Sequence, residues 1–178
     1  IDPIDAPPDS NPCTQNLCDM MGMPTYPPEP LNTMCVDKGG TLCDGLGNCL
    51  KAPGTGCGAG AECVTGFCVD GVCCNESCTA DCKACNVTGS FGTCANLPSG
   101  TADGAACSGM NSCDGMGACK RGNGQGCGMN TECASGNCVE GVCCNSPCME
   151  TCKTCMRSGF VGQCIDLPNE QLDTTATM

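Results

Sequence analysis

The chain contains no histidine and no tryptophan, and its only aromatic residues are Tyr26, Phe67, Phe91 and Phe160. Without histidine, Ser/His and Cys/His catalysis and histidine metal ligands are excluded. Aromatic side chains bury the most apolar surface per residue, so we do not expect a conventional hydrophobic core. Something other than apolar burial must therefore order the 178 residues.

Basic residues and long apolar runs are also scarce. Only seven residues are Lys or Arg against 19 acidic ones, which gives a net charge of −12. That charge repels phosphate backbones, so we expect no nucleic-acid partner. No stretch approaches the roughly 18 consecutive apolar residues of a transmembrane helix, so we expect no membrane span.

Cysteine, by contrast, makes up 26 of the 178 residues, well above the about 8–10% typical of a disulfide scaffold. In a reducing cytosol so many cysteines would indicate metal sites, whereas outside the cell they indicate disulfides. Zinc sites use closely spaced cysteine pairs, often with histidine, and most spacings here are longer. We therefore expect disulfides in an extracellular or cell-surface protein, with no cofactor and no metal.

The cysteine pattern occurs twice. A shift of 70 residues aligns Cys43-Asp-Gly-Leu-Gly-Asn-Cys49 with Cys113-Asp-Gly-Met-Gly-Ala-Cys119, and Gly71-Val-Cys-Cys-Asn75 with Gly141-Val-Cys-Cys-Asn145. Self-similarity at a fixed period is typical of repeat architectures. The sequence therefore predicts two tandem copies of one module.

Each copy supplies twelve cysteines, which suggests six disulfides per module. The predicted framework is Cys35, Cys43, Cys49, Cys57, Cys63, Cys68, Cys73, Cys74, Cys78, Cys82, Cys85 and Cys94, then Cys107, Cys113, Cys119, Cys127, Cys133, Cys138, Cys143, Cys144, Cys148, Cys152, Cys155 and Cys164. The sequence leaves their connectivity open. Neighbouring cysteines cannot form an unstrained bridge, so Cys73 and Cys74 should reach different partners, as should Cys143 and Cys144. Equivalent cysteines should pair equivalently.

The predicted fold class is small and disulfide-rich, with short strands and hairpins and little regular secondary structure. Frequent Gly, Asn, Asp and Pro interrupt the chain. A tight hairpin is expected within Cys63–Cys73 and Cys133–Cys143, where an Asp-Gly or Glu-Gly turn lies between valines. A short helical turn is expected over Ser77–Cys85 and Ser146–Cys155, where cysteines recur every three or four residues.

Residues 1–34 differ from the rest, because they are acidic, rich in proline and contain no basic residue. Such a composition favours an extended arm. The expected organisation is this arm, module 1 over 35–98, module 2 over 99–168 and a tail over 169–178. Cys13 and Cys18 are left over and could pair with each other or with another chain. The candidate arm-local or inter-subunit residues are Cys13, Cys18, Met20, Met21, Met23 and Tyr26.

Two local motifs could carry chemistry. Cys82-Lys-Ala-Cys85 and its copy resemble redox pairs, but no βαβ unit surrounds them, so structural bridging is favoured. Asp44 and Asp114 each open a Gly-rich loop with oxygen ligands that calcium could use. Ala118 replaces Asn48 in the second loop, which favours a simple turn.

The segment Gly66-Phe-Cys-Val-Asp-Gly-Val-Cys-Cys-Asn75, followed by Cys78, Cys82-Lys-Ala-Cys85 and Gly89-Ser-Phe-Gly-Thr-Cys94, carries a family resemblance. It resembles the cysteine-rich tandem repeats of myxobacterial and related deltaproteobacterial cell-surface proteins. The resemblance covers residues 35–168 and implies a stalk or adhesion region without catalysis.

The leading hypothesis is a non-enzymatic extracellular structural protein. It would form a surface filament, sheath or adhesive stalk as a homopolymer, head to tail, with the arm docking on a neighbour. One alternative is a secreted binding module, such as a protease inhibitor or ligand-binding ectodomain, with a cell-surface partner. A metal-storing thiol protein and an enzyme are weaker alternatives.

Overall fold

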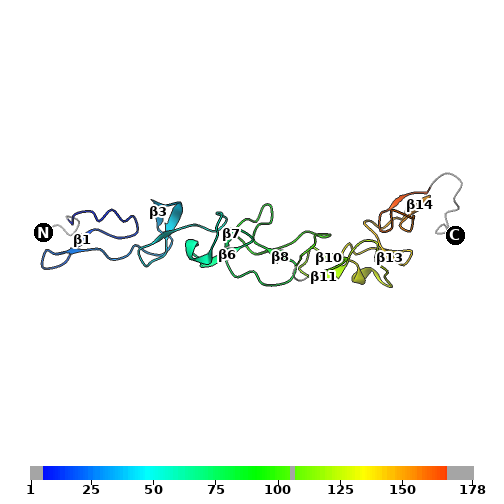
Figure 1. The fold of residues 1–178 in the computed structure, drawn as a ribbon, viewed down its shortest axis with the longest axis horizontal. Coiled ribbons are helices and arrows are strands. Elements are labelled where there is room, and N and C mark those ends of the chain that lie inside the picture. Colours follow the sequence, from blue (N-terminus) through cyan, green and yellow to red (C-terminus); the bar gives the residue numbers. More distant parts are fainter. Residues whose placement is uncertain (1–5, 105–106, 168–178) are drawn as a thin grey trace. The chain divides into compact units, whose positions relative to one another are not determined.

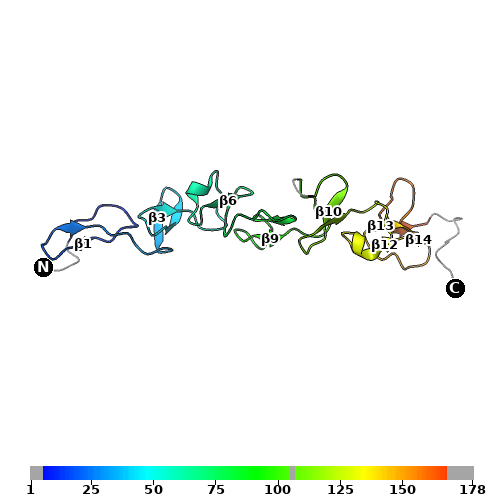
Figure 2. The same cartoon turned by 90° about the horizontal axis from the view of Figure 1, so that it is seen from below.

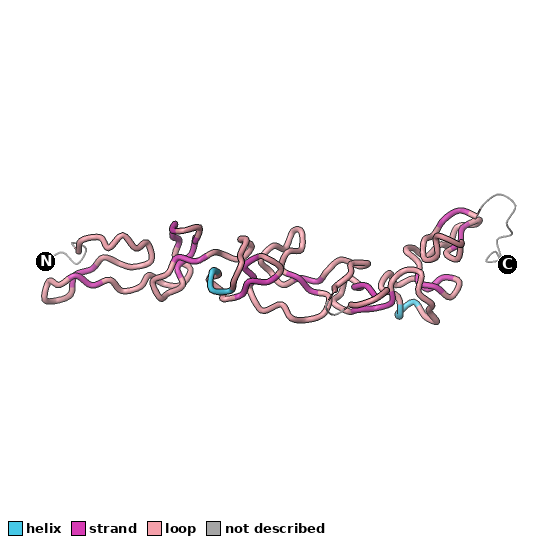
Figure 3. The backbone as a smooth tube through the Cα atoms, viewed as in Figure 1, coloured by secondary structure: helices cyan, strands magenta, loops and turns pink. Residues whose placement is uncertain are grey.

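The computed structural model describes residues 6–104 and 107–167, so the predicted tail over 169–178 lies outside the described residues. Short strands alternate with much longer loops (Figure 1, Figure 3). The chain divides into two compact units, Ile1–Cys78 with Ala84–Ala95 and Thr79–Lys83 with Asn96–Met178. The chain therefore crosses between the units more than once. The domain boundaries expected from the repeat remain predictions.

The first part of the chain forms small antiparallel sheets (Figure 1). Its strands are β1 (Leu17–Cys18), β2 (Pro24–Thr25), β3 (Met34–Asp37), β4 (Gly40–Cys43), β5 (Cys49–Leu50), β6 (Phe67–Val69) and β7 (Val72–Cys74). Strands β3, β4 and β5 form one three-stranded sheet, while β1–β2 and β6–β7 are hairpins.

The remaining strands form two-stranded sheets, of which the antiparallel pair β12 and β13 is seen side by side in Figure 2. They are β8 (Lys83–Ala84), β9 (Ala95–Asn96), β10 (Asn111–Cys113), β11 (Cys119–Arg121), β12 (Cys138–Val139), β13 (Val142–Cys143), β14 (Lys153–Thr154) and β15 (Ile165–Asp166). Within the described residues the only helices are two single 3-10 turns, η1 (Gly60–Glu62) and η2 (Asn130–Glu132). The predicted small disulfide-rich fold class is confirmed.

The predicted tight hairpin is present as β6–β7, in which Val69 pairs with Val72. Both residues of its turn lie in the left-handed region, Asp70 at φ 52° and Gly71 at φ 76°. A two-residue turn of this kind matches the twist of the flanking strands. The second copy repeats it, with Glu140 at φ 52°.

The helical turns predicted over Ser77–Cys85 and Ser146–Cys155 are wrong. Cys78 has φ 45° and Cys82 has φ 55°, and the equivalent cysteines of the second copy are also left-handed. A right-handed helix cannot include such residues. The spacing of three to four residues reflects cysteines that bond to distant partners rather than one helix face.

The extended arm is not confirmed, because residues 6–34 fold back on themselves. The Gln15 N–H donates to the Pro27 carbonyl at 2.9 Å, and the Tyr26 hydroxyl donates to the Pro7 carbonyl at 3.1 Å. Proline lacks an N–H but keeps its carbonyl, so a proline-rich strand can still accept hydrogen bonds.

Sulfur, rather than aromatic or aliphatic side chains, fills the interior. The buried residues gather in small clusters dominated by cysteine, with Val72 and Val142 in two of them. Phe67, Phe91 and Phe160 are exposed. Disulfides therefore take the place of a hydrophobic core, as the lack of aromatics predicted.

Candidate functional site: the disulfide network

Twelve disulfides join the described cysteines. Ten of these disulfides form five equivalent bonds, one in each copy, whereas Cys43 and Cys113 bond outside that pattern. The pairs are Cys35–Cys49 and Cys107–Cys119, Cys57–Cys68 and Cys127–Cys138, Cys63–Cys73 and Cys133–Cys143, Cys74–Cys85 and Cys144–Cys155, and Cys78–Cys94 and Cys148–Cys164.

The vicinal cysteines behave as predicted. Cys73 bonds to Cys63 and Cys74 bonds to Cys85, so adjacent residues of β7 are joined to segments on either side of it in sequence. The two cysteines of the Cys82-Lys-Ala-Cys85 motif also take different partners. This connectivity matches a structural role for the motif.

Two further disulfides contradict the expectation of six bridges closed within each module. Cys13 bonds to Cys43 and Cys82 bonds to Cys113, each with a Cα–Cα distance of 5.4 Å. We call these the hairpin-base disulfides. Cys13 therefore pairs neither with Cys18 nor with another chain. The expectation failed because it assigned each cysteine to a module by its order in the sequence.

The same backbone hydrogen bonds surround both hairpin-base disulfides. The Glu29 N–H donates to the Cys13 carbonyl, and the Leu97 N–H to the Cys82 carbonyl, each at 2.8 Å. Next along the chain, Asn32 N–H donates to Cys43 and Gly100 N–H to Cys113, again at 2.8 Å. Residues 13–33 thus repeat the arrangement of residues 82–101.

The sequence alone does not reveal that residues 13–33 repeat the hairpin of residues 82–101. The two hairpins share one sequence signal, Pro30-Leu-Asn-Thr33 and Pro98-Ser-Gly-Thr101. The carbonyl of Thr33 accepts the Cys43 N–H, and that of Thr101 accepts the Cys113 N–H, each at 2.8 Å. The shift between these motifs is two residues shorter than that between the two main copies. No cysteine of the first segment marks the positions of Cys85 and Cys94.

The disulfides divide into two classes by burial. Six have both cysteines buried: Cys13–Cys43, Cys63–Cys73, Cys74–Cys85, Cys82–Cys113, Cys133–Cys143 and Cys144–Cys155. In the other six at least one cysteine is half-buried: Cys35–Cys49, Cys57–Cys68, Cys78–Cys94, Cys107–Cys119, Cys127–Cys138 and Cys148–Cys164. All four cysteines of the hairpin-base disulfides are 0% exposed.

The other two cysteines lie on hairpins of this type. Cys18 is half-buried on β1 and forms no disulfide in the structure. Cys152 is exposed just before β14, at the position equivalent to Cys82, and its carbonyl accepts from the Leu167 N–H at 2.7 Å.

Some cysteine sulfurs are as close together as the ligands of a metal cluster, for example those of Cys74, Cys78 and Cys85, which lie within 4.8 Å of one another. All three belong to disulfides. Metals bind the thiolate form, so these oxidised sulfurs do not offer a thiolate site.

Asp44 and Asp114 serve their own turns. The Asp44 carboxylate accepts from the N–H groups of Leu46 and Asn48, at 2.7 and 3.0 Å, and from the Asn48 side chain at 2.7 Å. The Asn48 side chain is the main cause that lowers the Asp44 pKa. Hydrogen bonds from N–H groups to a carboxylate stabilise its charged form.

In the second copy a cation replaces that amide. Lys120 Nζ lies 2.9 Å from the Asp114 carboxylate, and this hydrogen bond is the main cause that lowers the Asp114 pKa to about 2. Both carboxylates therefore stabilise a Gly-rich turn beside a hairpin-base cysteine.

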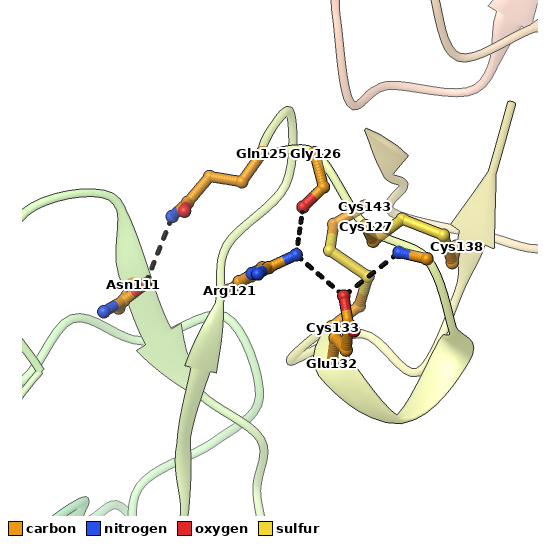
Figure 4. Close-up of polar contacts among 10 residues, drawn as sticks. Asn111, Arg121, Gln125, Gly126, Cys127, Glu132, Cys133, Cys138 and Cys143 are labelled. Carbon is orange, nitrogen blue, oxygen red and sulfur yellow. Dashed lines mark hydrogen bonds and ion pairs between the residues drawn. A yellow bond between two sulfur atoms is a disulfide. The ribbon is translucent and has the colours of Figure 1, made fainter. Parts of the chain in front are cut away.

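Figure 4 shows an ion pair that joins β11 to η2. Arg121 Nη1 lies 2.7 Å from both the Gly126 carbonyl and the Glu132 carboxylate. Lys51 and Glu62 form the equivalent ion pair in the first copy. In both copies the carboxylate also accepts a backbone N–H, from Gly58 or Gly128. In each copy the ion pair thus joins the end of a strand, β5 or β11, to the 3-10 turn that follows it in sequence.

The three methionines predicted as candidate inter-subunit contacts lie on the loop between β1 and β2. Met20, Met21 and Met23 are 104%, 89% and 61% exposed. Their backbone is nevertheless ordered, because the Asp19 carboxylate accepts from the Met21 and Met23 N–H groups at 2.9 and 2.8 Å. Tyr26 packs back toward Pro7 instead. We call residues 17–25 the methionine tip.

No protein-family model, curated protein or solved structure matches this chain. None of the helices in the described part is long and apolar enough to span a membrane. The dense disulfide network indicates a protein of an oxidising, extracellular environment.

Proposed function

We propose that this chain is a non-enzymatic structural protein, a subunit of a disulfide-stabilised surface filament, sheath or adhesive stalk. The observation that carries the proposal is the repeated hairpin-base disulfide. It bonds one hairpin to the Cys-Asp-Gly motif that follows it, at Cys13–Cys43 and again at Cys82–Cys113. In repeat proteins the stability of each repeat depends on its contacts with the neighbouring repeats. The hairpin-base disulfides join successive parts of this chain in a comparable way, which suits an elongated structural role.

The proposed joint between subunits is the methionine tip. Exposed methionines form soft surfaces that adapt to a partner. Since Cys13 is bonded within its own chain, the hairpin base is fixed and the tip is the part that docks. Cys18 lies in the same tip and could take part in the contact. The partner in this proposal is a second copy of the chain.

The same tip also favours the second candidate, a secreted binding module. A cluster of three exposed methionines on one ordered loop fits a foreign partner as well as a second copy. The two candidates differ in one respect: only the structural role requires the purified chain to associate with itself.

Negative-stain electron microscopy of the never-reduced protein tests the proposal. We expect regular assemblies at high protein concentration. The variant Met20→Ser/Met21→Ser/Met23→Ser should abolish them. Met129→Ser/Met149→Ser/Met156→Ser, which removes three exposed methionines elsewhere, should leave them intact. Isolated particles at every concentration would contradict self-assembly and leave the binding module as the better candidate.

A further inference from the structure

We infer that the disulfide network makes this chain a tether, a chain whose greatest length under tension is fixed by covalent bonds. The six buried disulfides set that length, and loss of the six half-buried disulfides changes it little. The inference rests on the proposed structural role. It concerns what limits extension when the chain is pulled from its two ends.

A disulfide removes the residues of its loop from the load-bearing path, because force passes through the sulfur bridge. From Cys13 to Cys164 the shortest covalent path uses Cys13–Cys43, Cys57–Cys68, Cys74–Cys85, Cys82–Cys113, Cys127–Cys138 and Cys148–Cys164. At the usual extended length per residue, this path reaches about 200 Å. Without disulfides the same residues would reach about 530 Å.

The half-buried disulfides on this path have substitutes. Cys57–Cys68 overlaps in sequence with the buried Cys63–Cys73, so force can pass through either. Losing Cys57–Cys68 lengthens the shortest path by about one residue, or roughly 3.5 Å. The second copy has the same overlap between Cys127–Cys138 and Cys133–Cys143.

The buried disulfides are enough to limit the length. With all six half-buried disulfides removed, the remaining path reaches about 220 Å, roughly a tenth more than the intact network. A hairpin-base disulfide is harder to replace. Removing Cys82–Cys113 alone adds about eight residues, or roughly 30 Å.

Burial protects the same disulfides from reduction. A reductant must reach a sulfur atom to attack it, so access controls the rate. Cys82 and Cys113 are 0% exposed, whereas Cys57 and Cys68 are both half-buried. Mild reduction should therefore open the replaceable disulfides first and leave the length almost unchanged.

Force spectroscopy of the full chain tests the inference, with handles attached through cysteine-free tags at both ends. Cys82→Ala/Cys113→Ala should lengthen the fully extended chain by about 30 Å. The matched control, Cys57→Ala/Cys68→Ala, should lengthen it by less than about 5 Å. Peptide mapping must first show that the other disulfides of each variant are native.

The unmodified chain provides a second measurement that does not depend on how variants fold. Limited treatment with a phosphine converts a disulfide to two thiols, while the phosphine takes an oxygen atom from water and becomes its oxide. Alkylation and mass spectrometry then locate the opened pairs. We expect label first in the half-buried six, in molecules that keep nearly their full oxidised length.

The inference is overturned if the control variant lengthens as much as the Cys82→Ala/Cys113→Ala variant, or if the buried pairs are labelled first. Both measurements use single molecules or denatured peptides. A protein that forms no filament but passes both would contradict the proposed assembly while leaving the tether intact.

Discussion

The hairpins at residues 13–33 and 82–101 have the same base and different tips. At each base a buried disulfide and the same backbone bonds join the hairpin to the following Cys-Asp-Gly motif. The tip of the second hairpin is bonded by Cys74–Cys85 and Cys78–Cys94. The tip of the first has neither disulfide and presents methionines to solvent. The two hairpins thus share the arrangement of their bases and differ in their tips.

The largest expected effect comes from breaking the base. Cys82→Ala/Cys113→Ala opens a loop whose ends are 31 residues apart, and should lower the free energy of unfolding by about 4 kcal/mol. Cys13→Ala/Cys43→Ala, with a separation of 30 residues, should cost about the same. Chemical denaturation measures both. Costs that differ by more than about 2 kcal/mol would show that the two bases are not equivalent.

A smaller effect is expected at the methionine tip. Asp19→Ala removes the acceptor of the Met21 and Met23 N–H groups, and should cost about 1 kcal/mol of local stability. Hydrogen exchange of those two amides should accelerate, while exchange at the hairpin base stays unchanged. Faster exchange at Glu29 as well would mean that tip and base open together.

The acceptor that caps each base offers a conservative test. The Cys82 N–H donates to the Asp103 carboxylate at 2.8 Å, whereas the Cys13 N–H donates to the Asn11 side-chain carbonyl at 2.9 Å. Asp103→Asn should therefore be tolerated, with a cost below about 0.5 kcal/mol, while Asp103→Ala should cost about 1 kcal/mol. Equal costs in thermal unfolding would show that the base needs the charge rather than an acceptor.

The smallest effect concerns the turns next to the bases. The Asp114 pKa of about 2 lies below its ordinary value of 3.8. The charged carboxylate therefore stabilises the folded chain fully at pH values above 3.8, and this stabilisation is lost as the pH falls from 3.8 through about 2. Lys120→Gln should raise the Asp114 pKa and leave that of Asp44 unchanged. Carboxyl NMR titration of both residues checks this, and an unmoved Asp114 pKa would mean that its backbone N–H bonds dominate.

Local features could be predicted from the sequence. The β6–β7 hairpin follows from an Asp-Gly turn between valines, and the separate partners of Cys73 and Cys74 follow from the geometry of neighbouring residues. Both depend on residues close together in the chain.

The hairpin-base disulfides could not be predicted, because they join cysteines about 30 residues apart and no local spacing encodes that choice. Proline content also misled the interpretation of residues 1–34. The carbonyls of Pro27 and Pro7 accept hydrogen bonds, and Cys13 fixes the segment. Composition alone does not show such contacts.

Disulfide mapping of the never-reduced protein tests the central claim most directly. Cleavage before aspartate and after lysine, at acidic pH to prevent exchange, releases the tripeptide Asp81-Cys82-Lys83 and separates Cys82 from Cys85. We expect this tripeptide in covalent linkage with the fragment that contains Cys107 and Cys113. Linkage of the tripeptide to the fragment of Cys85 and Cys94 would close the bridge within one module and contradict the account.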